Sequence, residues 1–146
     1  MVETMRIDYT EITPLSVILF VWQIPQCLLG LILYFTFKIE PIEYTNNHTG
    51  MTVLWIPTKW NVCWSLGSFV FAHYGSGPEM LRHETGHCMQ SLYLGPVYLL
   101  AVALPSLVLF WIRRIFKKSH EWYYDHYPEN WANKLGGVDN IDNNGE

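Results

Sequence analysis

The sequence EMLRHETGHCMQSL occupies residues 79–92 and contains the pattern His-Glu-x-x-His at His83–His87. Pro78 precedes the stretch and Gly95-Pro96 follows it, which predicts a helix from about Glu79 to Leu92. Residues four apart in a helix lie on the same face, one turn from each other. The two imidazoles are therefore expected to project in the same direction.

This spacing is typical of a zinc site. Two imidazoles one turn apart can both reach a zinc ion at ~2.0–2.1 Å, and a glutamate beside them can take a proton from water as a general base. We therefore expect His83 and His87 to bind Zn²⁺ and Glu84 to act as the catalytic residue. The competing interpretation is a pair of surface histidines flanking a helical glutamate.

A zinc hydrolase needs a third protein ligand and one open position. Glu129 is the preferred candidate because it begins a short helix predicted over 129–135, where Asn133, one turn on, can orient its carboxylate. A glutamate in a first helical turn is also favoured by the helix dipole alone, so this residue has a purely structural explanation as well. His126 and His73 remain alternative third ligands.

Composition limits the class of protein. The chain has 146 residues, is half hydrophobic, and is only 15% charged, which excludes disorder as the main state and fits a single domain over residues 1–146. Its formal charge of −4 argues against nucleic acid as a partner. Cys27, Cys63 and Cys88 form no CxxC pair and no disulfide framework, and Cys88 is expected to pack in the interior.

Two uncharged stretches are long enough for a membrane. Residues 15–37 contain no charge over 23 residues, which favours a retained transmembrane helix over a buried core helix or a signal peptide. The second segment, 93–112, is interrupted at Pro105-Ser106 and followed by Arg113 and Arg114. If it spans the bilayer, the site faces out. If it is a re-entrant hairpin, which we favour, the site is cytoplasmic.

The region between these segments is rich in strand-forming residues. Met51–Pro57 and Val62–His73 are predicted strands, paired antiparallel through a turn at 58–61, and residues 38–50 are predicted to be a loop. Gly67 indicates a bulge or a close approach of another segment. The predicted fold is therefore an α+β integral membrane protein, with strands before the His-Glu-x-x-His helix and a C-terminal tail over 113–146.

The stretches RHETGHCMQSLYLGPVYLLAVALPS and YYDHYPENWANKLGGV, between Arg82 and Val138, carry a further signal. They resemble a family of small, uncharacterised bacterial membrane proteins of the zincin-like, gluzincin-like type, whose recurring features are HExGH, Gln-Ser, Leu-Gly-Pro, Leu-Pro-Ser, Tyr-Tyr and Glu-x-Trp-Ala. The resemblance implies a metallopeptidase with Glu129 as the later acidic member of the site. Gluzincins often carry an acid four residues after that glutamate, where this chain has Asn133.

The expected function is hydrolysis of peptide bonds by a zinc-dependent enzyme of the bacterial inner (cytoplasmic) membrane. Its partners would be the lipid bilayer and a peptide or protein substrate, which Val62–His73 could hold along a sheet edge. The alternative is a non-catalytic membrane accessory protein in which zinc only braces the tail. Such a structural site would be closed by four protein ligands, whereas a catalytic site keeps one position open.

Overall fold

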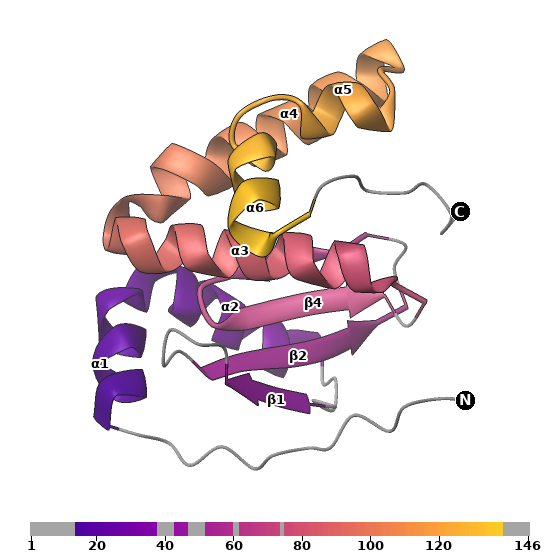
Figure 1. Cartoon of the computed structure of the whole chain (residues 1–146). Helices are drawn as coiled ribbons and strands as arrows, with labels where there is room; N and C mark the ends of the chain where they lie inside the picture. The colour runs from indigo at the N-terminus through magenta and orange to yellow at the C-terminus, as the bar shows by residue number, and fades with distance from the viewer. Residues whose placement is uncertain (1–13, 38–42, 47–51, 60–61, 74, 139–146) are drawn as a thin grey trace.

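The computed structural model describes residues 14–37, 43–46, 52–59, 62–73 and 75–138. These residues form a mixed fold of helices around a small sheet (Figure 1). Helices α1 (Pro14–Trp22) and α2 (Ile24–Phe37) come first, followed by four strands and then by helices α3 to α6. The sheet lies between α2 and α3, and the later helices stand on the far side of α3.

The segment 15–37, predicted as one transmembrane helix, forms two helices. The segment bends by 97° between α1 and α2, and Gln23 lies at the bend. Pro25, in the first turn of α2, has no backbone N–H to donate, which makes a break at this point inexpensive. The bend also lets the buried side chains of Gln23 and Gln26 turn towards protein partners instead of lipid or solvent.

Those partners lie at the carboxyl end of α3. The Ser91 hydroxyl donates to Gln23 Oε1 at 2.6 Å, and Gln26 Nε2 donates to Ser91 Oγ at 2.9 Å and to the Gly95 carbonyl at 2.8 Å. A buried polar group costs free energy unless it is hydrogen-bonded. These hydrogen bonds therefore join the α1–α2 bend to the carboxyl end of α3 and to Gly95, which follows it.

The sheet has the strand order β1-β2-β4-β3. Its strands are β1 (Glu43–Asn46), β2 (Thr52–Thr58), β3 (Trp64–Leu66) and β4 (Phe69–His73). Strand β2 runs antiparallel to β1 but parallel to β4, and β3 runs antiparallel to β4. The predicted antiparallel pairing of 51–57 with 62–73 is therefore wrong, and so is the loop over 43–46.

The physical reason lies at Gly67. The backbone φ there is +61°, a left-handed conformation that glycine adopts most easily, and the chain reverses over Gly67 and Ser68. Residues 62–73 therefore form a hairpin of two strands, and the second strand enters the sheet beside β2. A Cβ at Gly67 would also overlap the Cys27 sulfur, so the predicted close approach is present as well.

Strand β4 is buried on both faces, which explains its unbroken apolar sequence. Val70 and Ala72 contact Cys88 of α3 on one face. Phe69 and Phe71 pack with Cys27 of α2 and with Ile56 on the other. Cys88 is thus a packing residue, as predicted, and the sheet holds α3 in a fixed position.

Helix α3 (Pro78–Leu94) contains the predicted 79–92 helix. A 3₁₀ turn, η1 (Gly95–Val97), and a π-helical turn, η2 (Leu99–Ala103), lead into α4 (Leu104–Phe116), and α5 (His120–Tyr124) and α6 (Glu129–Gly136) follow. The predicted hairpin at Pro105-Ser106 is wrong, because the helix continues from Leu99 to Phe116. Pro105 lies in the first turn of α4, where a missing N–H is tolerated. The chain reverses instead at Gly95, whose φ is +53°.

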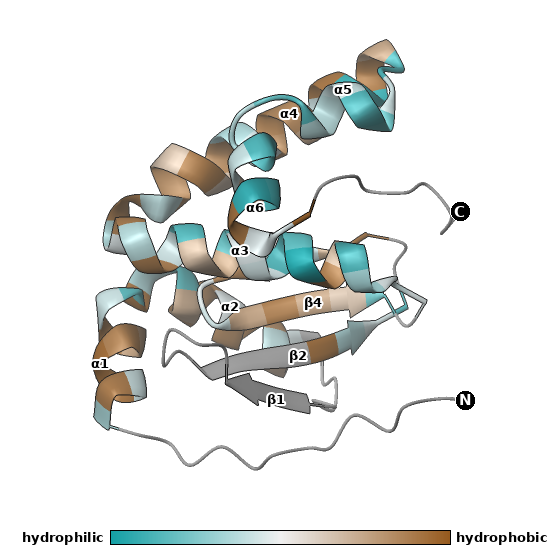
Figure 2. Ribbon diagram, viewed as in Figure 1, coloured by the Kyte–Doolittle hydropathy of each residue, from teal (hydrophilic) through white to brown (hydrophobic). Residues whose placement is uncertain are grey.

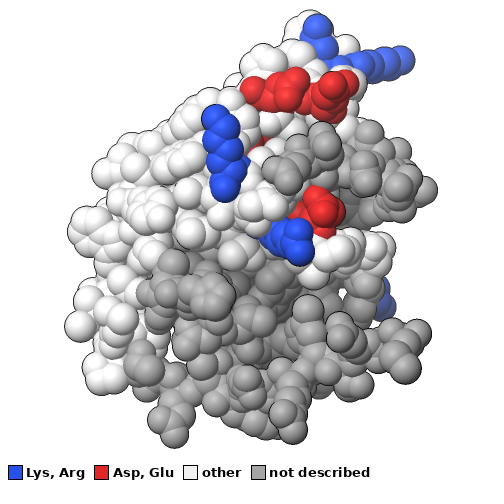
Figure 3. All heavy atoms as spheres, in the orientation of Figure 1, with Lys and Arg blue, Asp and Glu red and all other residues white. Residues whose placement is uncertain are grey.

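The outer faces of α1, α2 and α4 are apolar and exposed (Figure 2). Leu99–Phe116 is long and apolar enough to cross a membrane, and the bent pair α1–α2 passes the same test if it counts as one span. In Figure 3, the left flank of the molecule, over α1 and the start of α4, carries no charged side chain, whereas charges gather at the far end of α4 and α5. Among the described residues, exposed apolar side chains therefore gather on α1, α2 and α4.

Candidate metal centre

Three buried side chains from two helices converge on one point. His83 and His87 come from α3 and Glu129 from the first turn of α6, and all three are at most 6% exposed. Glu129 Oε2 lies 3.0 Å from His83 Nε2 and 3.1 Å from His87 Nε2, and the two Nε2 atoms are 3.1 Å apart. The cluster could hold a metal ion.

These separations fit one small cation. Ligand atoms at about 2.0–2.1 Å from a tetrahedral zinc ion lie roughly 3.3–3.4 Å from one another. The observed triangle is within a few tenths of an ångström of that size. Two nitrogens and one carboxylate oxygen are also a donor set that zinc accepts.

Each imidazole is held by a carboxamide on its other nitrogen. His83 Nδ1 lies 2.6 Å from Asn133 Oδ1, and His87 Nδ1 lies 2.7 Å from Gln90 Oε1. Gln90 Nε2 donates to the Pro128 carbonyl at 2.9 Å, so the Gln90 oxygen must be the atom that faces His87. His87 Nδ1 is therefore the donor, which leaves Nε2 free to bind a metal.

The Glu129 carboxylate is also oriented on both oxygens. Oε2 faces the two imidazoles, and Oε1 accepts a short hydrogen bond from the Ser106 hydroxyl of α4. Burial alone would raise the pKa of Glu129, but the charges and hydrogen bonds of His87 and His83 together outweigh this effect and hold the pKa well below its usual range. Burial alone would conversely lower the pKa of His87, which the Glu129 carboxylate raises to about 9.

Glycines bring α6 close enough to α3 to supply this carboxylate. A Cβ at Gly86 would overlap the backbone carbonyl of Ala132, and a Cβ at Gly136 would overlap that of Arg82. The second variable position of the motif, Gly86, is thus glycine because the backbone of another helix rests against it. The first turn of α6 then places Glu129 beside the histidines.

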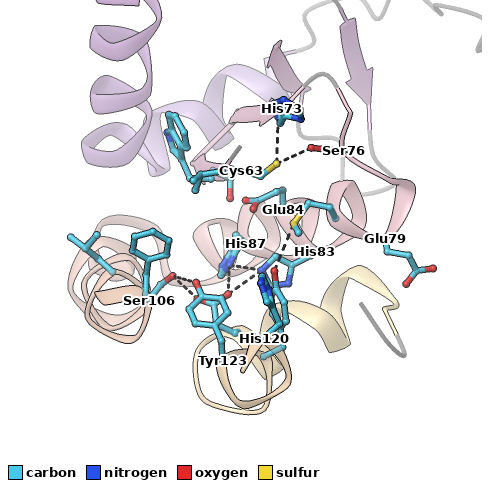
Figure 4. Close-up of a pocket in the computed structure, with 18 of the residues that line it drawn as sticks. Cys63, His73, Ser76, Glu79, His83, Glu84, His87, Ser106, His120 and Tyr123 are labelled. Atoms are coloured by element: carbon cyan, nitrogen blue, oxygen red, sulfur yellow. Dashed lines mark hydrogen bonds and ion pairs between the residues drawn. The ribbon is translucent and has the colours of Figure 1, made fainter. Parts of the chain in front are cut away.

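Glu84 lies next to the cluster and differs from it in its surroundings. It is 3% exposed, and its Oε2 atom finds no hydrogen-bond partner among the described residues. Burial raises its pKa, an effect that the two histidines partly offset. In Figure 4, Glu84 lies on the side of Cys63, and the imidazoles lie on the side of Tyr123. A buried carboxylate with an unused oxygen is suited to exchange a proton.

A cavity of about 810 Å³ opens beside these residues. Its floor is α3, with His83, Glu84 and His87. One wall is β3, the free edge of the described sheet, and the opposite wall is α4 and α5 (Figure 4). The cluster is therefore buried from solvent yet faces a space that is large enough for part of a peptide.

Two tyrosines of α5 complete the opposite wall. Tyr123 OH lies 3.4 Å from Ser106 Oγ, and the Tyr124 ring stacks edge-on against His83 at 5.1 Å between centroids. Burial raises the pKa of both phenols above the usual range, so both hydroxyls keep their protons. Either can donate a hydrogen bond into the cavity.

The other candidate ligands lie outside the cluster. His126 is exposed, and its Nδ1 bonds to the Trp122 carbonyl at 2.6 Å. His73 lines the cavity, but its Nδ1 accepts from the Gly75 backbone at 3.1 Å. Asn133, expected to orient Glu129, instead contacts His83.

Two residues of the site were not assigned from the sequence. Gln90 follows His87 by three residues, and this helical spacing was the available signal for its contact. Ser106 gives no such signal, because it meets Glu129 across 23 residues of chain.

No family model, no curated protein and no solved structure matches this chain. The resemblance to zincin-like membrane proteins therefore stays a prediction.

Proposed function

We propose that this chain is a membrane-bound zinc metallopeptidase. The observation that carries the proposal is the convergence of His83, His87 and Glu129 on one point, with Glu84 beside them holding an unused carboxylate oxygen. The outer hydrogen bonds of both imidazoles support it further, because they leave each Nε2 facing the same centre. In this proposal His83, His87 and Glu129 bind Zn²⁺.

A bound zinc ion would supply a Lewis acid that polarises an amide carbonyl and acidifies water. Glu84 takes the proton from the attacking water and then delivers it to the leaving amine. Its burial favours this exchange, because a raised pKa makes the carboxylate a better proton acceptor. Tyr123 and Tyr124 donate hydrogen bonds towards the carbonyl oxygen as negative charge develops on it.

The cavity supports a peptide as the substrate. Strand β3 lies at the edge of the sheet and lines the cavity, so an extended peptide can add backbone hydrogen bonds along it. The surrounding walls are largely apolar, with Leu66, Leu107 and Phe110 among the residues that line them. Such walls exclude water and accept apolar side chains.

A membrane location is part of the proposal. The exposed apolar faces of α1, α2 and α4 would cost free energy in water, and α4 ends at a basic cluster, Arg113, Arg114, Lys117 and Lys118, of the kind that lies at a cytoplasmic surface. We assign the protein to the bacterial inner membrane because the sequence resembles a bacterial membrane family.

The number of ligands favours catalysis over a structural zinc. A closed structural site uses four protein ligands, whereas the described residues offer three in this cluster. The described cavity lies beside the remaining position, where water and substrate can enter.

The test is metal content together with hydrolysis. We expect about one zinc per chain in detergent-purified protein by elemental analysis, and its loss in His83→Ala and Glu129→Ala. His126→Ala is the matched control, because this exposed histidine lies outside the cluster. Glu84→Gln should keep the zinc and lose hydrolysis of a quenched fluorescent peptide library, by about 10²-fold or more.

Two results would contradict the proposal. A Glu84→Gln protein that hydrolyses peptides at the wild-type rate would remove the mechanism. A zinc-loaded wild type that hydrolyses no peptide, in detergent or in liposomes, would favour the non-catalytic accessory protein instead.

A further inference from the structure

The cavity beside the metal centre is lined by side chains of two kinds. The apolar ones include Leu33, Leu66, Tyr98, Ala103 and Leu107. The polar ones include Ser76, Glu79, Arg113 and His120. Glu79 lies in the first turn of α3 and Tyr98 follows the end of that helix, so His83, Glu84 and His87 lie between them along the chain.

Helix α4 supplies residues of both kinds. Ser106, Phe110 and Arg113 follow one another at helical spacing and all line the cavity, so they share one face of α4. Ser106 bonds to Glu129 at the metal centre. Arg113 is seven residues further on, about 10 Å along the helix axis. Arg113 therefore leaves α4 about two turns beyond the residue that contacts the metal centre.

Arg113 differs from the other cations of its cluster. Arg114, Lys117 and Lys118 are exposed, whereas Arg113 is half-buried and is the one lysine or arginine among the described cavity residues. Its Nη2 donates to His120 Nε2, and its buried Nε atom has no hydrogen-bond partner among the described residues. Among the described residues no carboxylate forms an ion pair with Arg113, although the residue is half-buried.

A chain of ring contacts joins the part of the cavity that contains Arg113 to the ligands. His120 lies over Tyr124, with 6.5 Å between ring centroids, and Tyr124 lies against His83 at 5.1 Å. The Tyr124 hydroxyl also donates to Met80 Sδ at 3.9 Å, near the start of α3. The part of the cavity that contains Arg113 is therefore on the His83 side of the metal centre.

We propose that Arg113 is a specificity-determining residue, which binds a carboxylate of the substrate while apolar side chains of the same peptide contact the apolar lining residues. This inference rests on the proposed function, in which the cavity binds a peptide. A half-buried guanidinium without a carboxylate partner favours a carboxylate ligand, because its N–H groups form charge-assisted hydrogen bonds with one. Glu79 does not compete for it, since it lies 3.9 Å from Arg82.

A carboxylate can come from the C-terminus of a peptide or from an acidic side chain. The experiment separates these sources from each other, and separates binding from hydrolysis. Glu84→Gln protein, loaded with zinc in detergent, is titrated with fluorescein-labelled apolar hexapeptides, and binding is read by fluorescence anisotropy. One pair of peptides differs only in a free or amidated C-terminus, and a second amidated pair carries Glu or Gln near its C-terminus.

We expect at least one carboxylate peptide to bind about tenfold more tightly than its neutral partner, as one charge-assisted hydrogen bond predicts. When Arg113→Gln is combined with Glu84→Gln, the difference between charged and neutral peptides should disappear. The affinity for the neutral peptides should stay unchanged, and this unchanged affinity would show that the variant is folded. Arg113→Lys should keep part of the difference, because it retains the charge without the planar guanidinium fork. Arg114→Gln is the matched control and should change nothing.

Equal binding of charged and neutral peptides would overturn the inference, and so would an equal effect of Arg113→Gln and Arg114→Gln. Both results would leave the proposed function standing if the wild type hydrolyses peptides in a Glu84-dependent way. Conversely, an Arg113-dependent preference in a protein that hydrolyses nothing would support the inference and contradict the peptidase.

Discussion

In the metal-free protein, His87 and Glu129 form a buried ion pair. His87 has a pKa raised to about 9, and Glu129 has a pKa below its usual range, each because of the other's charge. A metal ion binds the deprotonated imidazole, so it must displace the proton of His87. Metal and proton therefore compete for the same nitrogen.

The metal-free protein should consequently lose stability as the pH rises above neutrality. The stabilisation from His87 is fully present below its unfolded pKa of about 6.5 and is lost as the pH rises through about 9. The stabilisation from Glu129 is present above about 4.5 and is lost in stronger acid. We expect the unfolding temperature of chelator-treated protein to fall between pH 6.5 and 9.

Thermal unfolding in detergent across pH 5–10 checks this expectation. Glu129→Gln removes the carboxylate that raises the pKa of His87. The decline in unfolding temperature between pH 6.5 and 9 should therefore disappear in this variant. An unfolding temperature that stays constant over this range in the metal-free wild type would contradict the ion pair.

The carboxamide behind His87 should control metal affinity. Gln90→Leu removes the acceptor of the Nδ1 proton, and loss of such a partner typically weakens metal binding by about 10–100-fold. The measurement is zinc affinity by competition with a chromophoric chelator. Met89→Leu, one residue earlier on α3, is the control and should bind zinc like the wild type. Unchanged affinity in Gln90→Leu would mean that the hydrogen bond does not orient the ring.

For individual residues of the site, residue types at fixed helical spacing predicted which side chains lie close together. His83, His87 and Gln90 lie on one helix, so their proximity follows from 3.6 residues per turn. Glu129 was singled out by its position after Pro128, and the structure brings it to the two histidines, although its role as a ligand stays a prediction. Ser106 was missed because its contact depends on how α4 and α6 pack, which no local pattern encodes.

The contact between α3 and α6 determines whether Glu129 can reach the two histidines. Gly86 has the Ala132 carbonyl directly against it, so Gly86→Ala should force α6 away from α3 and move Glu129 from the histidines. An alanine in an unobstructed helix interior would instead stabilise the protein by roughly 0.5–1 kcal/mol. We expect a lower unfolding temperature and a zinc affinity reduced by more than about tenfold.

Gly77→Ala is the matched control for this prediction. No atom lies within 4 Å of the position of a Cβ at Gly77, and its φ of −71° suits any residue. It should bind zinc normally and change stability by less than about 0.5 kcal/mol. If Gly86→Ala also binds zinc normally, the two helices do not need their close approach.

Helices were predicted better than strands, for a physical reason. The ends of α3 and α6 follow from Pro78, Gly95 and Pro128, which act locally. Strand pairing depends on partners far along the chain, so the parallel pairing of β2 with β4 could not be read from alternation. Gln23 and Pro25 interrupt the apolar stretch in the sequence, but the 97° bend also depends on Ser91, a residue 68 positions from Gln23.

For the whole molecule, the exposed apolar side chains of α1, α2 and α4 make a testable prediction about lipid. Trp22 and Trp111 are 49% and 53% exposed on these helices. In liposomes that contain brominated lipids, their fluorescence should be quenched, and Trp22→Phe with Trp111→Phe should remove most of the quenching. Trp64→Phe is the control, since that ring is stacked on Phe71 at 5.1 Å.

Quenching that persists at full strength in the double variant would place the lipid contact elsewhere. A protein that stays in solution without detergent or liposomes would contradict the membrane assignment altogether. The sequence predicted two apolar segments correctly by composition, but the first bends by 97° and the second is an uninterrupted helix instead of the favoured hairpin. The composition of a segment indicates whether it favours an apolar environment, but it says little about where the chain bends or reverses.

The packing of α6 on α3 has a consequence for the order of events in the cell. The ribosome makes His83 and His87 well before Glu129, so a nascent chain halted between them holds two of the three ligands. Such a chain can neither complete the triangle of donor atoms nor position Ser106 against the carboxylate. The proposed proteolytic activity would therefore begin only after α6 has been translated and has folded back onto α3, which spares the translation machinery and the emerging chain itself from premature cleavage.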